Sequence, residues 1–556
     1  MRIITGTEII SRPSKFLLLV LLPVINPHAR AVDDSGSSEA PRYGTAPTGE
    51  PYELAGKRLV FANWYYVRPG KFSWRDAKEN IVTANAQPIG PLEAHMVMQD
   101  SPRGIRLVME RPQRSGPLLQ PERPWEKEGI NFITLIHDLD RYRAWGGCQA
   151  GKSNSFCYFE SSDGLKWTRP ELGLVEFEGS SKNNLIDVAA GSVFIDPSSP
   201  PEERYKAVRL SDKHTIADLT DYIKRRPKDI DWRSERGDIN YLAYPIMGAV
   251  SADGLHWKLK PEPLIVEHSD TLIVAYYDSI LRKYVIYTRN WMVGPQSANA
   301  RDPRRQRWLD MGRRSIGRTE SDHFGDFPLS DVILEPGPDM APSDVLYTNC
   351  KTTIPGAPDQ HLLFPTVWHT SDDTTTVVAA SSHNGKVWHY LPGPPVLETA
   401  NFGEWDGGSV FASPNLVELP DGAWALPYSG FNFPHKYPRG SWAYRPGYVL
   451  WPKGRMVALE AKDQGEFATV GLVPPGRRLR MNAVTQRGGR ILVEVADIDG
   501  KTRVGHSFQE AVPIIGDQYR TPVTWGKEGR LVEEAGEPII LRFRMEKARI
   551  YWLDFE

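Results

Sequence analysis

SSDGLKW at residues 161–167 returns as SADGLHW at residues 251–257. Two looser copies follow, TESDHFGDFP at 319–328 and SSHNGKVWHYLP at 381–392. Asp-Gly and Asn-Gly supply the positive φ that a tight two-residue turn needs, and the aromatic residue after the turn covers the hairpin. The turn positions are 90, 69 and 62 residues apart and are Asp163, Asp253, Asp322 and Asn384. Such spacing predicts repeated units with loop insertions, in which Asp163, Asp253 and Trp257 serve turns and packing.

A second repeated pattern predicts hairpins at 132–147, 193–210, 272–290 and 414–430, each an apolar strand, a polar turn and a second strand. Two hairpins per unit make a four-stranded antiparallel sheet, and radially arranged sheets make a β-propeller. We expect five blades, near 130–170, 190–262, 270–330, 344–398 and 408–430. The strand IRLVMERP at 105–112 is expected to complete the last blade and so remove an exposed sheet edge.

The two ends of the chain differ from this repeated part. After about residue 450, the stretches 491–502 and 538–555 alternate apolar and polar residues with period two, which predicts a β-sandwich. Residues 32–50 are rich in Ser, Gly and Pro and predict a flexible leader. The sequence therefore predicts an all-β protein in four parts: a signal peptide (1–31), the leader (32–50), a five-bladed β-propeller (51–450) and a β-sandwich (451–556).

The N-terminal prediction depends on Arg2, Arg12 and Lys15, which precede the apolar run FLLLVLLPVI at 16–25. Ten apolar residues are too few to span a bilayer. With a small-x-small site ending at Ala31, the pattern is typical of a cleaved secretory signal, and it predicts a secreted or periplasmic protein with no membrane contact after cleavage. The alternative is a buried N-terminal strand or helix.

Charge and cysteine content limit the partners. The chain has 67 basic and 69 acidic residues, a net charge of −2, which gives no reason to expect nucleic acid or an anionic membrane. Of three cysteines, Cys148 and Cys157 flank a loop that could bring them together, and export would permit a bridge. No Cys/His spacing is typical of zinc. We expect no cofactor; calcium on the propeller axis is compatible with the fold, but no ligand cluster argues for it.

The segments PWE at 124–126, SSDGLKWTRPELGLVEFEGSSKNN at 161–184 and GEWDGG at 403–408 carry a family resemblance. With five blades and a trailing sandwich, the chain resembles exported glycosyl-hydrolase-like proteins of bacteria, in the five-bladed propeller superfamily of invertases, levansucrases, arabinanases and β-xylosidases. It departs from invertases, because neither Asn-Asp-Pro-Asn nor Glu-Cys occurs, and Arg-Asp-Pro at 301–303 lies in a basic loop.

In a propeller the first strands converge on the axis, and their N-terminal ends form a funnel. A polar group precedes each predicted first strand: Glu126, Asn183 and Asn184, Asp270, Asp344, and Glu404 with Asp406. Glycoside cleavage needs one protonated and one ionised carboxyl group. We expect Asp270 as the ionised partner, Glu404 as the acid, and Asp406 as a like charge that shifts the pKa of Glu404.

The expected substrate-binding residues are Glu126, Asn184, Asp344 and Trp405, with the pair Arg318 and Glu320. Trp405 provides a face on which a sugar can stack. A buried Arg–Glu pair can bind sugar groups, whereas an exposed one has no such meaning. For the carboxylates, the alternative is turn capping before a strand.

These residues predict an exported glycoside hydrolase acting on an oligo- or polysaccharide. The absent invertase motifs keep open a non-catalytic carbohydrate-binding propeller, and a scaffold for protein partners is a third alternative. The sequence does not give the sugar, the linkage or the oligomeric state.

Overall fold

The computed structural model describes residues 50–82, 94–150, 153–187, 191–210, 244–267, 269, 271–292, 313–436 and 443–556. Over these ranges the protein is all-β. Its helices there are short 3-10 turns, η1 (Pro124–Glu126), η2 (Pro201–Glu203) and η4 (Pro452–Gly454). None of the helices in the described part of the chain is long and apolar enough to cross a membrane. The predicted signal peptide and nearly all of the leader lie outside the described residues.

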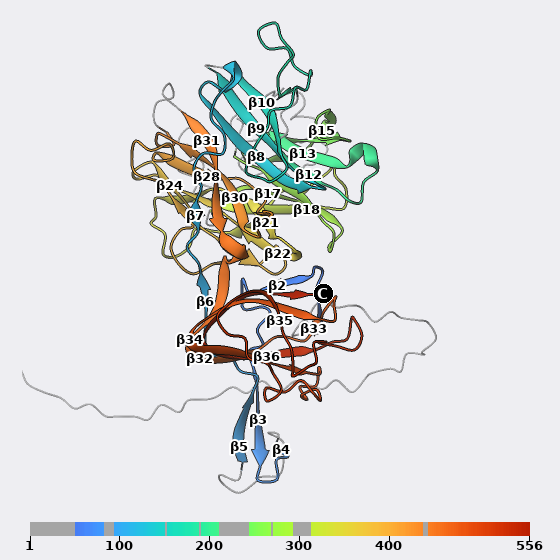
Figure 1. The fold of residues 1–556 in the computed structure, drawn as a ribbon. Coiled ribbons are helices and arrows are strands. Elements are labelled where there is room, and N and C mark those ends of the chain that lie inside the picture. Colours follow the sequence, from blue (N-terminus) through green and yellow to red (C-terminus); the bar gives the residue numbers. More distant parts are fainter. Residues whose placement is uncertain are drawn as a thin grey trace, which may run out of the picture. The chain divides into compact units, whose positions relative to one another are not determined.

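The first three sheets are built from strands that follow one another in sequence (Figure 1). Sheet 1 has β8 (Gly129–Asp138), β9 (Arg141–Ala150), β10 (Ser153–Ser161) and β11 (Leu185–Ile186); sheet 2 has β12 (Ser192–Ile195), β13 (Tyr205–Leu210), β14 (Tyr244–Ser251) and β15 (Lys258–Glu267); sheet 3 has β16 (Val274–Asp278), β17 (Lys283–Met292), β18 (Arg313–Ser321) and β19 (Asp331–Leu334). The antiparallel pairs β8–β9, β12–β13 and β16–β17 confirm three of the four predicted hairpins.

Sheet 4 has the same plan, but its strands are bent. Each continues after a break of a few residues, so that it is divided between two four-stranded sheets. The segments are β20 (Asp344–Thr348), β21 (Lys351–Ile354), β22 (Ala357–Leu363), β23 (Thr366–His369), β24 (Thr374–Val377), β25 (Ala380–Ser382), β26 (His389–Tyr390) and β27 (Leu397–Glu398).

Sheet 5 is completed by a strand from far earlier in the chain. It contains β28 (Ser409–Ala412), β29 (Val417–Glu418), β30 (Trp424–Phe431) and β31 (Tyr444–Trp451), and β7 (Gln113–Arg114) pairs with β31. The pair β29–β30 confirms the predicted hairpin at 414–430. The prediction that residues 105–112 complete this sheet is wrong, because residues 105–109 pair with residues 457–461 instead. Pro112, which has no backbone N–H, separates that strand from β7, which pairs here.

The repeated strand groups contact one another in a cyclic order, and sheets 1 and 5 are hydrogen-bonded to each other through β8 and β31. First strands of neighbouring sheets meet at β8–β12 and β12–β16, and further contacts join β18 to β20, β24 to β28 and β31 back to β8. Three repeated turns reinforce this order, because each turn glycine accepts a hydrogen bond from another sheet. Gly164 O accepts from Tyr448 (2.8 Å), Gly254 O from Trp145 (2.7 Å) and Gly385 O from Tyr287 (2.9 Å).

The repeated turns have a structural role, as predicted. Asp163 Oδ1 accepts the N–H groups of the second and third residues after it, at 2.8 Å each, and Asp253 and Asn384 do the same at 2.8–2.9 Å. The indole of Trp257 donates to Gly254 O within its own turn (3.0 Å). All of these side chains form hydrogen bonds that hold the turn.

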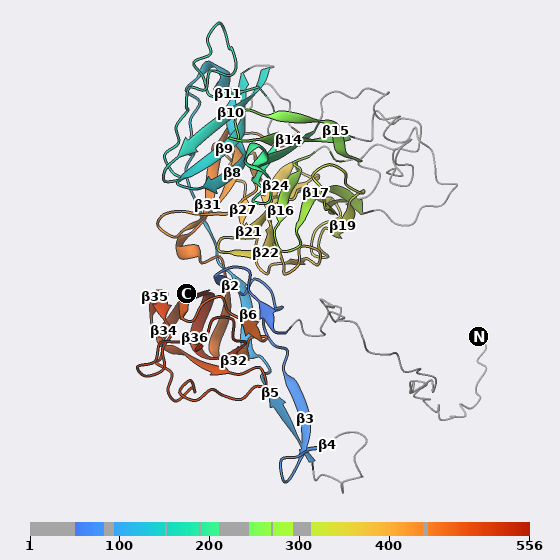
Figure 2. The ribbon, with the colours of Figure 1, turned by 90° about the vertical axis from the view of Figure 1, so that its right-hand side faces the viewer.

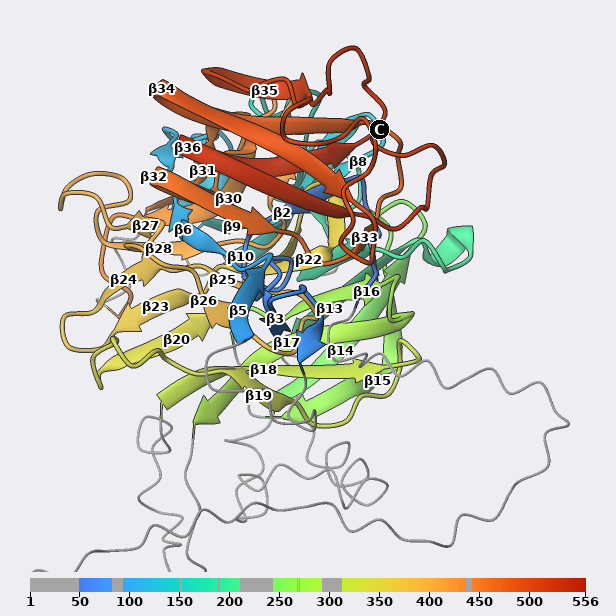
Figure 3. The same cartoon turned by 90° about the horizontal axis from the view of Figure 1, so that it is seen from below.

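The C-terminal sheet recruits two strands from the start of the described chain. Its order is β35 (Asp517–Pro522), β34 (Leu479–Ala496), β36 (Ile540–Phe555), β32 (Val457–Ala468) and β6 (Arg103–Met109), and β2 (Arg58–Val60) also pairs with β36 (Figure 3). Nearby, β1 (Tyr52–Glu53) pairs in parallel with β33 (Leu472–Val473). The propeller is predicted to span residues 51–450, and its N-terminal boundary is wrong. The strands within residues 52–109 pair with C-terminal strands or with each other, and none of them joins the repeated sheets.

A small sheet of three strands is inserted between β2 and β6. It has the order β4 (Ile81–Val82), β3 (Lys71–Asp76) and β5 (Ala94–Gln99). In Figures 1 and 2 no other described strand lies beside it. The buried cores of the repeated part lie between neighbouring sheets: one joins sheets 1 and 5, and another joins sheets 2 and 3. The C-terminal core joins residues within 54–67 to residues within 459–555.

Candidate functional site

The first strands of the repeated sheets converge at their C-terminal ends. One cavity of about 470 Å³ is lined by residues from the ends of β8, β12 and β21 and from the segment after β28, including Ile136, Ile195, Thr353 and Leu416. The opposite, N-terminal ends of these strands define what we call the strand-start face. There, a second cavity of about 230 Å³ lies between the starts of β12 and β16 and is lined by Ser192, Arg209 and Thr271 among others.

Aromatic side chains from two sheets gather near the strand-start face where β20 and β28 begin. We call Tyr347, Trp368, Phe411 and His435 the aromatic cluster. The His435 ring centroid lies 4.5 Å from that of Tyr347, 5.4 Å from Trp368 and 5.1 Å from Phe411. Tyr347 and Phe411 are only partly buried, so part of each ring remains accessible.

Charged groups from neighbouring elements surround this cluster. The Arg314 guanidinium, from sheet 3, lies 4.7 Å from the centroid of the Tyr347 ring, and the Lys436 ammonium lies 5.4 Å from that of Trp368. The Asp373 carboxylate accepts the Trp368 indole N–H at 2.9 Å and the Lys436 backbone N–H at 2.6 Å. Partly exposed rings beside guanidinium and carboxylate groups can stack on a sugar ring and bind its hydroxyl groups.

The expected ionised carboxylate, Asp270, lies outside the described residues. Its neighbours are described. Ser269 is fully buried and its hydroxyl accepts the Arg289 backbone N–H at 2.9 Å. Thr271 lines the cavity between β12 and β16.

Glu404 and Asp406 lie in different surroundings although they are two residues apart. Glu404 is exposed and accepts a hydrogen bond from the Asn401 amide at 2.9 Å. Asp406 is buried and accepts hydrogen bonds from the Tyr428 hydroxyl (2.9 Å) and from Arg114 (3.4 Å). Burial and the neighbouring Asp406 raise the pKa of Tyr428, which therefore keeps its proton.

Trp405, between these two carboxylates, packs inward. It is partly buried, and its ring centroid lies 5.5 Å from that of Tyr428. The aromatic ring of Trp405 also lies close to Gly430 and Gly447, where a side chain would collide with it. The structure thus brings Trp405 and Asp406 together around Tyr428.

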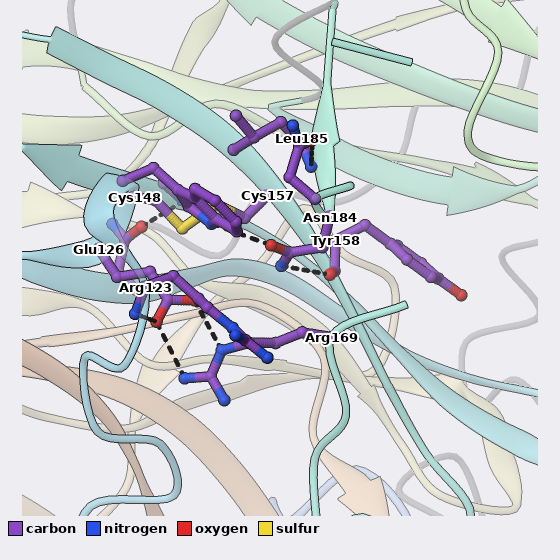
Figure 4. Close-up of a disulfide and its surroundings, with 12 residues drawn as sticks. Arg123, Glu126, Cys148, Cys157, Tyr158, Arg169, Asn184 and Leu185 are labelled. Atoms are coloured by element: carbon purple, nitrogen blue, oxygen red, sulfur yellow. Dashed lines mark hydrogen bonds and ion pairs between the residues drawn. A yellow bond between two sulfur atoms is a disulfide. The ribbon is translucent and has the colours of Figure 1, made fainter. Parts of the chain in front are cut away.

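Glu126 and Asn184 have internal partners (Figure 4). Glu126 is fully buried; one of its oxygens accepts the backbone N–H groups of Glu122 and Arg123, and Arg169 donates to both oxygens, at 2.7 and 3.0 Å. Asn184 accepts the indole N–H of Trp125 at 3.0 Å and donates to the Tyr158 carbonyl at 2.9 Å. The alternative of turn capping describes Glu126 well, because it caps η1.

The disulfide between Cys148 and Cys157 lies in the same region. The two cysteines are on β9 and β10, and their Cα atoms are 6.1 Å apart. Cys350, the third cysteine, is free and buried.

Arg318 and Glu320 form the expected pair, at 2.7 Å on β18. Arg318 is buried and Glu320 is partly exposed. Burial alone would raise the pKa of Glu320, but hydrogen bonds from Arg318 and Lys386 lower it.

Asp344 caps its own turn, with the Ala341 N–H at 3.0 Å, and also lies 2.8 Å from His369 Nδ1. Turn capping, the alternative role of this carboxylate, is therefore present. The partner of Asp344, His369, directly follows Trp368 of the aromatic cluster in the sequence.

Sequence reasoning missed the aromatic cluster. A signal was present, since Tyr347 and Phe411 each follow a predicted strand start by two or three residues, in APSDVLYTN and GEWDGGSVF. No group of three or more His, Cys, Asp or Glu side chains suited to a metal ion occurs within the described ranges.

No family model matches the chain, and no curated protein matches it in sequence. Solved structures do match. An N-acetylgalactosamine deacetylase from F. plautii, in complex with blood group B trisaccharide, is 12% identical with a TM-score of 0.37, over 63% of this chain and 96% of that chain. An α-L-arabinofuranosidase from Podospora anserina, in complex with cellotriose, is 10% identical with a TM-score of 0.36, over 62% and 98%.

A sucrose-6-phosphate hydrolase from Lactobacillus gasseri is 10% identical with a TM-score of 0.33, over 77% of this chain and 90% of that chain. At this level of similarity, conclusions about architecture and activity have to come from the strand pairings and side chains of this chain itself.

Proposed function

We propose that this chain is an exported glycoside hydrolase that cleaves an oligo- or polysaccharide at the strand-start face of a five-bladed β-propeller. The cyclic order of contacts among the five sheets supports the propeller, because five radial sheets whose last member contacts the first form a closed ring. We further propose that the C-terminal sheet belongs to a β-sandwich. Its core joins residues from both halves of the long strands β34 and β36.

The observation that carries the proposal is the aromatic cluster near the strand-start face. Its rings come from sheets 4 and 5, and the Arg314 guanidinium of sheet 3 lies over Tyr347. Accessible ring faces and fixed polar groups at one place are what a sugar site requires.

For the reaction we propose Asp270 and Glu404 as the two carboxyl groups. Glu404, protonated, gives its proton to the leaving glycosidic oxygen as the C–O bond breaks, and Asp270, ionised, acts on the anomeric carbon directly or activates the water that replaces the leaving group. The exposure of Glu404 supports this role, because a fully buried acid such as Glu126 is out of reach of a sugar.

The other expected residues are proposed in supporting roles. Asp406 and Trp405, held by Tyr428, position the loop that carries Glu404. Arg318 with Glu320, and Asp344 with His369, are proposed substrate contacts. We assign Glu126 and Asn184 to positioning of η1 and β10, because their side chains already have internal partners.

Export is proposed from the N-terminal pattern of the sequence. The disulfide between Cys148 and Cys157 supports it, since such bonds persist in oxidising compartments.

The test is hydrolysis of a panel of plant and algal oligosaccharides by the purified chain, followed by chromatography of the products. We expect Asp270→Asn and Glu404→Gln to lower kcat/KM at least 1,000-fold on the cleaved substrate. Glu534→Gln, an exposed carboxylate in the C-terminal part, is the control and should keep full activity. Hydrolysis that survives both substitutions would refute the assignment.

Calorimetric binding of the same oligosaccharides separates the alternative function. A chain that binds a sugar tightly, cleaves none and binds equally well after Glu404→Gln is a carbohydrate-binding propeller rather than a hydrolase.

A further inference from the structure

The three-stranded sheet of β3, β4 and β5 has one apolar face. Phe72 lies opposite Met98, and Trp74 lies opposite Met96 and Val82. Directly paired residues point to the same side of a sheet, and so do residues two apart on one strand. Phe72, Trp74, Val82, Met96 and Met98 therefore share one face, which we call the hairpin face.

The hairpin face is open to solvent. Phe72 is 62% exposed, Trp74 48%, Met96 54% and Met98 41%. Of the tryptophans whose burial is described, Trp64 and Trp74 are the exposed ones. A strand with alternating apolar residues normally turns its apolar side to a core, so an uncovered apolar side indicates a surface for another molecule.

A polar pocket adjoins this face. Met98 belongs both to the hairpin face and to the lining of a cavity of about 330 Å³ between β5, β6 and the C-terminal strands. In that pocket Arg542 holds two carboxylates, Asp100 at 2.7 Å and Glu494 at 3.0 Å.

Two further groups of the pocket suit a ligand rich in hydroxyl groups. The Phe508 ring lies 4.2 Å from the Arg544 guanidinium, and both line the pocket. Fixed donors and acceptors beside an apolar surface are typical of sites that bind sugars.

We propose that the hairpin face and the adjoining pocket bind a polysaccharide chain, with Phe72 and Trp74 as stacking platforms and the pocket holding one sugar unit. The proposal rests on the proposed function, since it names a polymer as the substrate that this surface retains. Phe72 and Trp74 are two residues apart on one strand, which places them about 6.6 Å apart along it. Successive units of an extended glycan can therefore lie over the two rings.

A second copy of the chain fits the surface less well. An aromatic side chain has about 150–250 Å² of surface, so the half-exposed Phe72 and Trp74 contribute roughly 100 Å² each, and with Met96 and Met98 the face offers at most about 400 Å². A stable protein interface needs about 800 Å² from each partner. A lipid surface would leave the carboxylates and guanidinium groups of the pocket without a role.

The test is co-sedimentation of the full chain with insoluble xylan, arabinan, cellulose and chitin. It is carried out in the Glu404→Gln background, so that hydrolysis cannot remove the polymer. We expect retention by at least one polymer and a Kd at least 10-fold higher for Phe72→Ala/Trp74→Ala. Leu139→Ala, 84% exposed in the turn between β8 and β9, is the control and should bind like the parent.

Circular dichroism melting and sedimentation velocity of each variant complete the experiment. Retention by no polymer, or unchanged retention of the double variant, would overturn the proposal. A dimer that dissociates in the double variant would also overturn it, because the face would then be a protein interface.

The outcome is separable from that of the proposed function. Cleavage of soluble oligosaccharides without retention by any polymer would leave the hydrolase standing and remove this surface site. Retention through Phe72 and Trp74 without any cleavage would support the surface site and refute the hydrolase.

Discussion

The repeated sheets and the C-terminal sheet are assembled in opposite ways. Sheets 1 to 4 use strands that follow one another along the chain, closed by Asp-Gly or similar turns. The C-terminal sheet takes β2 and β6 from residues 58–109 and pairs them with β36 and β32, several hundred residues later. The first kind of sheet is specified by local turns, whereas the second depends on side chains that recognise distant strands.

Those distant contacts are charged: the Arg58–Asp554 pair is fully buried, and the Arg549–Glu110 pair is partly exposed. Arg58 on β2 binds Asp554 on β36 through two hydrogen bonds, at 2.7 and 3.0 Å, and Arg549 on β36 binds Glu110, just after β6, at 2.6 Å. An ion pair removed from water is costly to break, because one charge is left without its partner. Deleting one charge of the buried pair should therefore cost more than deleting one charge of an exposed pair in the same sheet.

The largest expected effect is that of Arg58→Ala. Arg58 and Asp554 are both fully buried, and Arg58 also binds Glu418 of sheet 5 at 2.9 Å. We expect a loss of about 3–5 kcal/mol in the free energy of unfolding, measured by urea denaturation. Arg490→Ala removes an exposed partner of Glu546 at 2.9 Å and should cost at most about 1 kcal/mol. Equal costs for the two variants would contradict the distinction between buried and exposed ion pairs.

The next effect concerns a repeated turn. Gly254 has φ +78°, and a Cβ atom there would lie 2.8 Å from the buried Trp145 ring. Gly254→Ala should cost about 2–4 kcal/mol, from left-handed backbone strain and from the collision. Gly173 has φ +73° with nothing within 4 Å of its Cβ position, so Gly173→Ala should cost only the strain, about 1–2 kcal/mol. Thermal melting of both variants gives the comparison.

The disulfide provides a contrast between regions. It closes a short loop in sheet 1, and its removal in Cys148→Ala/Cys157→Ala should cost about 2–3 kcal/mol. Hydrogen exchange should show lost protection in β9 and β10 and unchanged protection in β34 and β36. Loss of protection over both regions would mean that the two parts unfold as one.

The smallest effect is one of pH. Burial alone would raise the pKa of Asp196, but hydrogen bonds from Ser198, Ser199 and Tyr284 lower it to about 2. Because the pKa is lowered in the folded state, the stabilisation is complete above about pH 4 and is lost as the pH falls toward 2. Lys206 lies 3.4 Å from this carboxylate and both side chains are buried, so Asp196→Asn leaves a buried charge without its partner. The substitution should cost about 2 kcal/mol at pH 7 and flatten the stability curve over that range. A parallel acid denaturation curve would contradict this.

The sequence contains much of the repeated architecture and little of the rest. The hairpins and the turns at Asp163, Asp253 and Asn384 follow from residues within a few positions of each other, so local physics suffices. The pairing of β2 and β6 with the C-terminal sheet depends on partners such as Asp554, which no local pattern reveals.

The candidate site shows the same limit. Glu126 is predicted to bind substrate from its place before a strand, yet its partner Arg169 comes 43 positions later and buries the charge. The aromatic cluster combines residues of sheets 4 and 5, and only the packing of those sheets brings Tyr347, Phe411 and His435 together.

The most direct measurement is a crystal structure of the Glu404→Gln protein with a soluble oligosaccharide that the parent chain cleaves. A sugar stacked on the aromatic cluster, with its scissile bond between residue 404 and Asp270, is the predicted result. A sugar bound only at the opposite ends of the first strands, in the cavity lined by Ile136 and Thr353, would contradict a catalytic strand-start face.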